Sequence, residues 1–348
     1  CDADGVALLA TCEHPIEESL RDRIAAISHP GAEEIQRMGA LDRELGRLFA
    51  TAVRVLLEQS GHRAPDIAAI GSHGQTIRHQ PPSVCAPGQA FTLQIGDPNT
   101  ISELTGITTV ADFRRRDVAA GGEGAPLAPA FHAAAFSSAG SDRAVINIGG
   151  IANATLLQGD TLYAGFDTGP GNTLLDQWIR RHRGEPCDRN GHWAAGGTVD
   201  PQLLERLLQH PFLGGSGPRS TGKEAFNLPW LDSQLGAASA GDPADVQATL
   251  AEFTARSIAA AIRDSGLAPG EIYLCGGGSH NLDLVGRLSR QLPDATMDTT
   301  DALGIDPDWV EGAAFAWLAS RTVAGLAGNA PVVTGAAGER VLGAIYPA

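Results

Sequence analysis

Glycine turns follow three apolar runs between residues 143 and 281, and this pattern constrains the fold more than any other. The runs are RAVINIGG at 143–150, a strand that enters GFDTGPGN at 165–172, and EIYLCGGGSHN at 271–281. Helical patterns follow the second and third turns. Strands that alternate with helices and end in glycine turns are typical of α/β proteins with binding loops at strand ends. The sequence therefore predicts an α/β fold.

The rest of the chain continues this pattern of strands and helices. A length of 348 residues suits two packed domains. The glycine-rich segment 119–126 predicts a loop, and we expect the domain boundary near the Ala-rich helix that follows it at about 128–137. The other expected strands are 5–11, 67–71, 91–97 and 107–113, and the other expected helices are 41–60, 243–264 and 309–325.

Composition excludes several classes of protein. The formal net charge of −15 argues against a general nucleic-acid binder, which needs a basic face. The sequence has no uninterrupted apolar stretch of about 18 residues, so we expect no membrane span. No signal peptide is visible. The five cysteines are scattered without a Cys-x-x-Cys pair, which favours reduced thiols in a cytoplasmic protein. The first residue is Cys, so we expect the natural N-terminus to lie further upstream.

Two of the glycine turns have both a functional and a structural interpretation. In NIGG, consecutive N–H groups beside Gly149 and Gly150 can converge on an anion, but the same residues also suit a plain hairpin turn. In CGGG, Gly276, Gly277 and Gly278 let a flat ring lie against the backbone ahead of a helix N-terminus. A crowded strand–helix crossing explains the same glycines.

Asp167 is the strongest single candidate for catalysis. It follows a strand and precedes the Gly-Pro-Gly turn, and a carboxylate at the end of a parallel strand points into the crevice where such sheets bind ligands. The structural alternative is that Asp167 caps the turn.

A second group of candidates lies in the first half of the chain. His73 sits in the turn SHGQT after a strand, and Arg114, Arg115, Arg116 and Asp117 follow another strand. A lone histidine and a charge run are often merely structural or solvated. Their positions at strand ends indicate instead that at least one arginine faces an acidic substrate.

Together these segments resemble the anhydro-N-acetylmuramic acid kinase family of actin-like ATPases, from about residue 2 to residue 347. The resemblance implies a two-domain actin-like ATPase (ribonuclease H-like) fold with a central nucleotide cleft. It also implies domains at 1–127 with 330–348, and at 128–329. The segments that carry it, in order, are SHGQTIRH, LQIGDP, VADFRRRDVAAGGEGAPLAPAFH, NIGGIAN, FDTGPGN, STGKEAFNLPWL, CGGGSHN and WVEGAAFAWLA.

The resemblance also implies a reaction. ATP and water convert 1,6-anhydro-N-acetylmuramic acid, a sugar of peptidoglycan recycling, into N-acetylmuramic acid 6-phosphate and ADP, with Mg²⁺ as a cofactor. Asp167 matches the family's general base. We expect a cytoplasmic enzyme without nucleic-acid or membrane partners, and a homodimer is one option; the metal ligands stay unassigned. Expected nucleotide ligands are Asp2, Asn147, Gly149, Gly150, Gly276, Gly277 and Gly278, and expected sugar ligands are His73, Arg114, Asp117, Asn172 and Glu311.

The sequence departs from the family at its start. The family begins with a strand and a Gly-Thr-Ser-x-Asp-Gly loop that cradles the ATP phosphates, whereas this sequence begins CDADGVALL. Asp2 or Asp4 is expected to be what remains of that loop. Two alternatives therefore stay open: a sugar-binding or regulatory homologue with impaired catalysis, and another actin-like sugar kinase.

Overall fold

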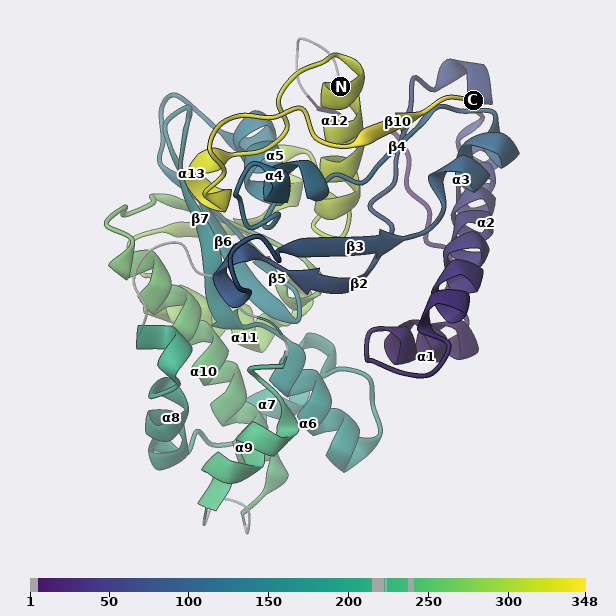
Figure 1. Cartoon of the computed structure of the whole chain (residues 1–348). Coiled ribbons are helices and arrows are strands. Elements are labelled where there is room, and N and C mark those ends of the chain that lie inside the picture. The colour runs from purple at the N-terminus through teal and green to yellow at the C-terminus, as the bar shows by residue number, and fades with distance from the viewer. Residues whose placement is uncertain (1–5, 215–221, 223, 237–240) are drawn as a thin grey trace. The chain divides into compact units, whose positions relative to one another are not determined.

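The computed structural model describes residues 6–214, 222, 224–236 and 241–348 (Figure 1). The chain forms two compact units: unit 1 comprises Cys1–Ala135 with Glu311–Ala348, and unit 2 comprises Phe136–Val310. These bounds differ from the expected domain bounds. Nearly all of the Ala-rich helix α5 (Ala128–Phe136) and of α12 (Val310–Val323) falls within unit 1, although both were expected in the second domain.

Unit 2 is built on a five-stranded sheet with the order β7-β6-β5-β8-β9. β6 is antiparallel to both β5 and β7, whereas β5, β8 and β9 are parallel. This is the topology of a ribonuclease H-like fold, and it confirms the α/β prediction. The strands are β5 (Arg143–Ile148), β6 (Ile151–Gln158), β7 (Thr161–Pro170), β8 (Glu271–Cys275) and β9 (Thr296–Thr299).

Two apolar cores hold unit 2 together. Alternate residues of β5, β6 and β8, such as Ile146, Leu156 and Leu274, pack against α10 and α11. A second core joins the first half of α10, from Ala244 to Phe253, to α6, α7, α8 and α9. The helices are α6 (Thr173–Arg183), α7 (His192–Ala195), α8 (Pro201–Leu208), α9 (Leu228–Leu235), α10 (Pro243–Asp264) and α11 (Leu282–Gln291).

Unit 1 contains a small mixed sheet and a separate hairpin. In the described residues the sheet has the order β1-β4-β10, with β1 parallel and β10 antiparallel to β4, and β2 pairs with β3. The strands are β1 (Ile70–Gly71), β2 (Gln75–Gln80), β3 (Phe91–Ile95), β4 (Thr109–Ala111) and β10 (Ala344–Tyr346). The remaining helices are α1 (Glu18–Ile27), α2 (Glu34–Ser60), α3 (Pro98–Thr105), α4 (Arg115–Ala119) and α13 (Pro331–Thr334).

The strand predicted at 5–11 is wrong for the described part of that range. Residues 6–11 have no regular secondary structure, and the Leu9 side chain is 81% exposed. An apolar run becomes a strand only where a neighbouring strand accepts its hydrogen bonds, and no described strand pairs with these residues. Periodicity alone cannot supply that partner.

No helix in the described part of the chain is both long enough and apolar enough to cross a membrane.

Candidate functional site

A row of polar side chains crosses the sheet of unit 2. Asn147 on β5 lies opposite Asn153 on β6, and Asn153 lies opposite Asp167 on β7. The neighbours of Asn147 in the strand, Ile146 and Ile148, point into the core beneath α10 and α11. Because side chains alternate along a strand, the row lies on the other face of the sheet.

A β-bulge sets the position of Asp167. On β7 the residues Asp167 and Gly169 face consecutive residues of β6, so Thr168 is the extra residue, and its hydroxyl donates to the Ala152 carbonyl at 3.1 Å. The prediction that Asp167 directly follows its strand is wrong, because β7 continues to Pro170. A bulge re-aims the side chains on either side of it and is common next to active sites.

The three glycine segments of unit 2 meet at the carboxyl end of β5. The Gly171 N–H donates to the Gly150 carbonyl at 2.9 Å, and the Asn172 N–H donates to the Gly149 carbonyl at 2.8 Å. A Cβ on Gly276 would lie 2.2 Å from Asn147 Oδ1. The hairpin and the crowded crossing that explained these glycines structurally are therefore both present, and they bring the predicted nucleotide residues of this unit together.

A cavity of about 490 Å³ opens beside this meeting point. Gly277 and Asn172 form part of its wall, together with the start of α6 and residues 187–190. A Cβ on Gly277 would meet nothing closer than Asn172 Nδ2 at 4.0 Å, so the backbone is open to a flat ring. The residues present thus fit a nucleotide base. Asn172, which was expected at the sugar, lies on this side and donates to the Ile148 carbonyl at 3.1 Å.

In unit 1, His73 and Arg114 form a partly buried pair. Arg114 Nε donates to His73 Nε2 at 3.0 Å, so the ring proton is on Nδ1, which donates to the Gly74 carbonyl at 2.9 Å. Burial, followed by the Arg114 charge, lowers the pKa of His73 to about 4, so the ring is neutral at pH 7. Burial also lowers the pKa of Arg114 to about 10, which leaves it charged. The Phe315 ring packs on His73 with the centroids 4.6 Å apart.

Asp117 anchors the loop beside this pair. Its carboxylate is fully buried and accepts hydrogen bonds from the Gly124 N–H, Asn329 Nδ2 and Thr334 Oγ1 at 2.8–2.9 Å. The Gly124 carbonyl in turn accepts from Arg114 Nη1 at 2.8 Å. This geometry favours a positioning role for Asp117 over the direct sugar contact expected from the sequence.

Glu311 is an exposed residue in the first turn of α12 and belongs to unit 1. The negative charge of Glu311 raises the pKa of Arg114 more than that of Asp117 does, which opposes the fall caused by burial. The Glu311 carboxylate and the Arg114 guanidinium are therefore electrostatic neighbours. The structure therefore groups His73, Arg114, Asp117 and Glu311, the residues of this unit that were expected at the sugar; their contact with the sugar stays a prediction.

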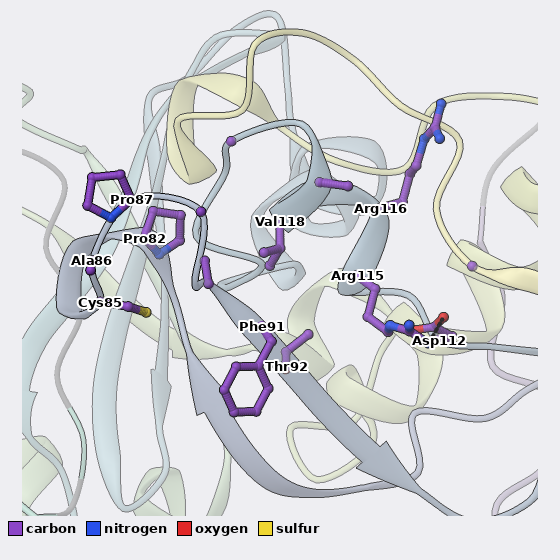
Figure 2. Close-up of a pocket in the computed structure, with 15 residues that line it drawn as sticks. Pro82, Cys85, Ala86, Pro87, Phe91, Thr92, Asp112, Arg115, Arg116 and Val118 are labelled. Atoms are coloured by element: carbon purple, nitrogen blue, oxygen red, sulfur yellow. Dashed lines mark hydrogen bonds and ion pairs between the residues drawn. The ribbon is translucent and has the colours of Figure 1, made fainter.

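Two cavities of unit 1 adjoin this group. A polar cavity of about 260 Å³ is lined by His73, Gln94, Asp112 and Arg115, among others. A larger and more apolar cavity, of about 990 Å³, includes Phe91 and shares Asp112 and Arg115 with the first (Figure 2). Neither Gln94 nor Asp112 was expected as a site residue from the sequence.

Some predicted features are not placed by the structure. Asp2 and Asp4 lie outside the described residues. Within the described part, no group of three or more His, Cys, Asp or Glu is arranged to hold a metal ion. Asn153 was missed as a member of the polar row. Asn153 follows Gly150 by the same number of residues by which Asn147 precedes it. This spacing predicts that Asn147 and Asn153 pair across the strands only once NIGGIAN is known to be a hairpin.

Comparison with known proteins identifies the family. The family model "Anhydro-N-acetylmuramic acid kinase" matches residues 1–348. A protein of that name from Shewanella sp. (strain MR-4) is 51% identical over 343 residues, covering 98% of this chain and 91% of that protein. One of the same name from Pseudomonas fluorescens (strain Pf0-1) is 49% identical over 345 residues, covering 99% and 93%. A solved ROK family glucokinase from Streptomyces griseus, in complex with glucose and AMPPNP, aligns over 72% of this chain and 81% of its own, at 16% identity and a TM-score of 0.29. The chain belongs to the anhydro-N-acetylmuramic acid kinase family.

Proposed function

We propose that this protein is an ATP-dependent kinase of 1,6-anhydro-N-acetylmuramic acid in cytoplasmic peptidoglycan recycling. Membership of the family along the whole chain supports the reaction. The observation that carries it is the placement of Asp167, which lies in register with Asn153 and Asn147 next to the meeting point of the glycine segments. A carboxylate with neighbouring amides can accept a proton from water and hold that water in place.

In this mechanism Asp167 acts as the general base. It takes a proton from a water molecule as the water oxygen attacks the anomeric carbon of the sugar. The bond between the anomeric carbon and O6 breaks, and O6 takes the γ-phosphoryl group of ATP while ADP leaves. The anomeric carbon gains the water oxygen, as in an inverting glycosidase, and the proton passes from Asp167 to solvent.

The glycine segments of unit 2 are assigned to the nucleotide. We place the base against Gly277 and Asn172, where the cavity wall is bare backbone. Mg²⁺ would neutralise charge between the β- and γ-phosphates. It usually binds through one or two carboxylates together with phosphate oxygens and water, so a preformed cage of protein ligands is not required.

The sugar is assigned to the residues of unit 1. His73, Arg114 and Glu311 form its polar surroundings, and Asp117 acts from within by holding the loop that carries the Gly124 carbonyl. Neutral His73 leaves Arg114 as the cation of this group at pH 7.

The test is an ATP-dependent assay with 1,6-anhydro-N-acetylmuramic acid in ¹⁸O-labelled water. We expect ADP to form in equal amounts with a sugar 6-phosphate, and the label to appear on the anomeric carbon only. Label in the phosphate, or ADP formed without sugar phosphate, would contradict the mechanism.

The matched substrate is N-acetylmuramic acid, which has the same substituents but no anhydro bond. Phosphorylation of this open sugar as fast as the anhydro sugar would favour the alternative of an ordinary sugar kinase. Tight sugar binding without turnover of either substrate would favour the non-catalytic alternative, which the departure from Gly-Thr-Ser at the start of the sequence motivates.

A further inference from the structure

The three consecutive arginines of unit 1 have three different environments. Arg114 is partly buried; its Nε donates a hydrogen bond to His73, and its Nη1 donates one to the Gly124 carbonyl. Arg115 lines both cavities and pairs with Asp112 at 3.3 Å. Arg116 lines only the larger cavity, is exposed, and its guanidinium has no hydrogen bond or ion pair to another described residue. Figure 2 shows the Arg115 side chain directed at Asp112, whereas Arg116 extends away from it.

The polar cavity has the size and lining of a sugar site with one cation. Apart from neutral His73, Arg115 is the basic side chain among the described residues that line it. The carboxylates in the wall are already engaged: Asp42 Oδ1 accepts from the Gly96 N–H at 2.7 Å, and Asp97 Oδ1 accepts from the Asn99 N–H at 3.0 Å. An acid group that enters among carboxylates needs a cation that is free to turn toward it.

The pair of Arg115 with Asp112 is easily exchanged. Its N–O distance is long, and the Arg115 side chain is 67% exposed, so the pair contributes little to stability. Asp112 has φ of 61°, a left-handed conformation that is unusual outside glycine and that occurs at functional sites. Burial raises the pKa of Asp112, which shows that its charge is incompletely compensated where it lies.

We propose that Arg115 is the specificity-determining residue for the acid group of the sugar: the lactyl carboxylate takes the place of Asp112 on the Arg115 guanidinium. This assignment rests on the proposed function and sharpens it, because the sequence analysis chose Arg114 for the sugar. Arg114, the residue before helix α4, then serves to hold the loop that carries the Gly124 carbonyl.

The experiment measures binding by calorimetry with two sugars. One is 1,6-anhydro-N-acetylmuramic acid, and the other is 1,6-anhydro-N-acetylglucosamine, which lacks only the lactyl group. The variants are Arg115→Gln and, as a matched control on the same helix α4, Arg116→Gln. We expect Arg115→Gln to weaken binding of the acid sugar by about tenfold or more, the value of one charge-assisted hydrogen bond, and to change binding of the acid-free sugar less than about twofold. Arg116→Gln should change neither.

Arg115→Lys adds a test of geometry. It keeps the charge but loses the planar fork, so it should restore part of the preference for the acid sugar. An equal loss for both sugars in Arg115→Gln, no loss at all, or the selective loss appearing in Arg116→Gln would overturn the proposal. So would wild-type protein that binds both sugars equally. Wild-type protein that prefers the acid sugar but never phosphorylates it would refute the proposed function and leave the role of Arg115 standing.

Discussion

At the scale of single residues, the position of Asp167 is set by the pairing of β7 with β6 and by the β-bulge at Thr168. Because Thr168 bulges out, Asp167 faces Asn153 while Gly169 faces Ala152. The sequence GFDTGPGN was enough to select Asp167. It could not reveal the bulge, because a bulge depends on how β7 pairs with β6 and leaves no periodic trace along β7.

Asp167→Asn should lower turnover by roughly 100-fold to 10,000-fold, because the amide keeps the shape of the side chain but cannot accept the proton from water. Sugar and nucleotide binding should persist in calorimetry, and circular dichroism should be unchanged. Asp160→Asn, on the exposed turn between β6 and β7, is the matched control and should keep full turnover. Near-normal turnover of Asp167→Asn would remove this residue as the base.

His132 should make the protein sensitive to acid. It lies fully buried on α5, and burial lowers its pKa from 6.5 to about 3. Between these values the unfolded chain binds a proton that the folded protein does not, so the free energy of unfolding falls as pH falls from 6.5 toward 3, by on the order of 5 kcal/mol. Urea unfolding across this range should show a shallower pH slope for His132→Leu. The same slope in both proteins would refute this assignment.

At the scale of elements, the triple-glycine turn is supported by helix α11, which begins just after it. Arg287 on α11 is almost fully buried, donates to Asp283 at 2.7 Å and pairs with Glu252 on α10 at 3.3 Å. Glu252 also pairs with Arg256 at 2.8 Å, but there the arginine is 44% exposed. The two arginines thus share one carboxylate in different surroundings.

Arg287→Ala should destabilise the protein by about 3 kcal/mol or more, because it leaves Asp283 without its cation and Glu252 with only the exposed Arg256. Arg256→Ala removes the exposed partner of the same carboxylate and should cost less than about 1 kcal/mol. Chemical denaturation of both variants measures the difference. Equal losses would mean that burial does not decide the strength of these pairs.

Gly278→Ala should damage both stability and nucleotide binding. Its Cβ would lie 2.2 Å from Ile148 Cγ2, and relieving such an overlap typically costs about 1–3 kcal/mol. The shift would move the wall of the nucleotide cavity, so the KM for ATP should rise more than the KM for the sugar. Gly286→Ala on α11 meets only Arg290 Nη1 at 3.6 Å and should be neutral or stabilising. A rise in both KM values alike would argue against a nucleotide site here.

Secondary-structure elements could be predicted from the sequence where apolar residues repeat at a regular spacing along the element. Helix α2 was expected from Leu41, but it begins at Glu34, because Met38 extends the stripe by one turn and packs on the same core. The strand expected at 67–71 is reduced to Ile70–Gly71, where pairing with β4 exists. Elements that depend on a distant partner could not be placed from local sequence.

At the scale of the whole molecule, the net charge of −15 makes binding of an anionic nucleotide depend on local groups. Backbone N–H groups and Mg²⁺ can supply these without a basic surface. ATP with Mg²⁺ should therefore raise the melting temperature. At about 100 times Kd it should add about 2.7 kcal/mol to the free energy of unfolding. Differential scanning fluorimetry with and without EDTA measures this, and a shift that survives EDTA unchanged would exclude a role for the metal in binding.

The discontinuous course of unit 1 bears on how the protein is made. Unit 2 is one continuous stretch, whereas the sheet of unit 1 needs β10, which the ribosome adds only after all of unit 2. Domains fold largely in order of synthesis, and pairings between segments distant in sequence form late. The middle of the chain can thus mature while β4 still waits for its antiparallel neighbour. In that interval the open edge of β4 is a site for chaperones, and nascent chains stalled before residue 344 should be captured by them more often than released protein.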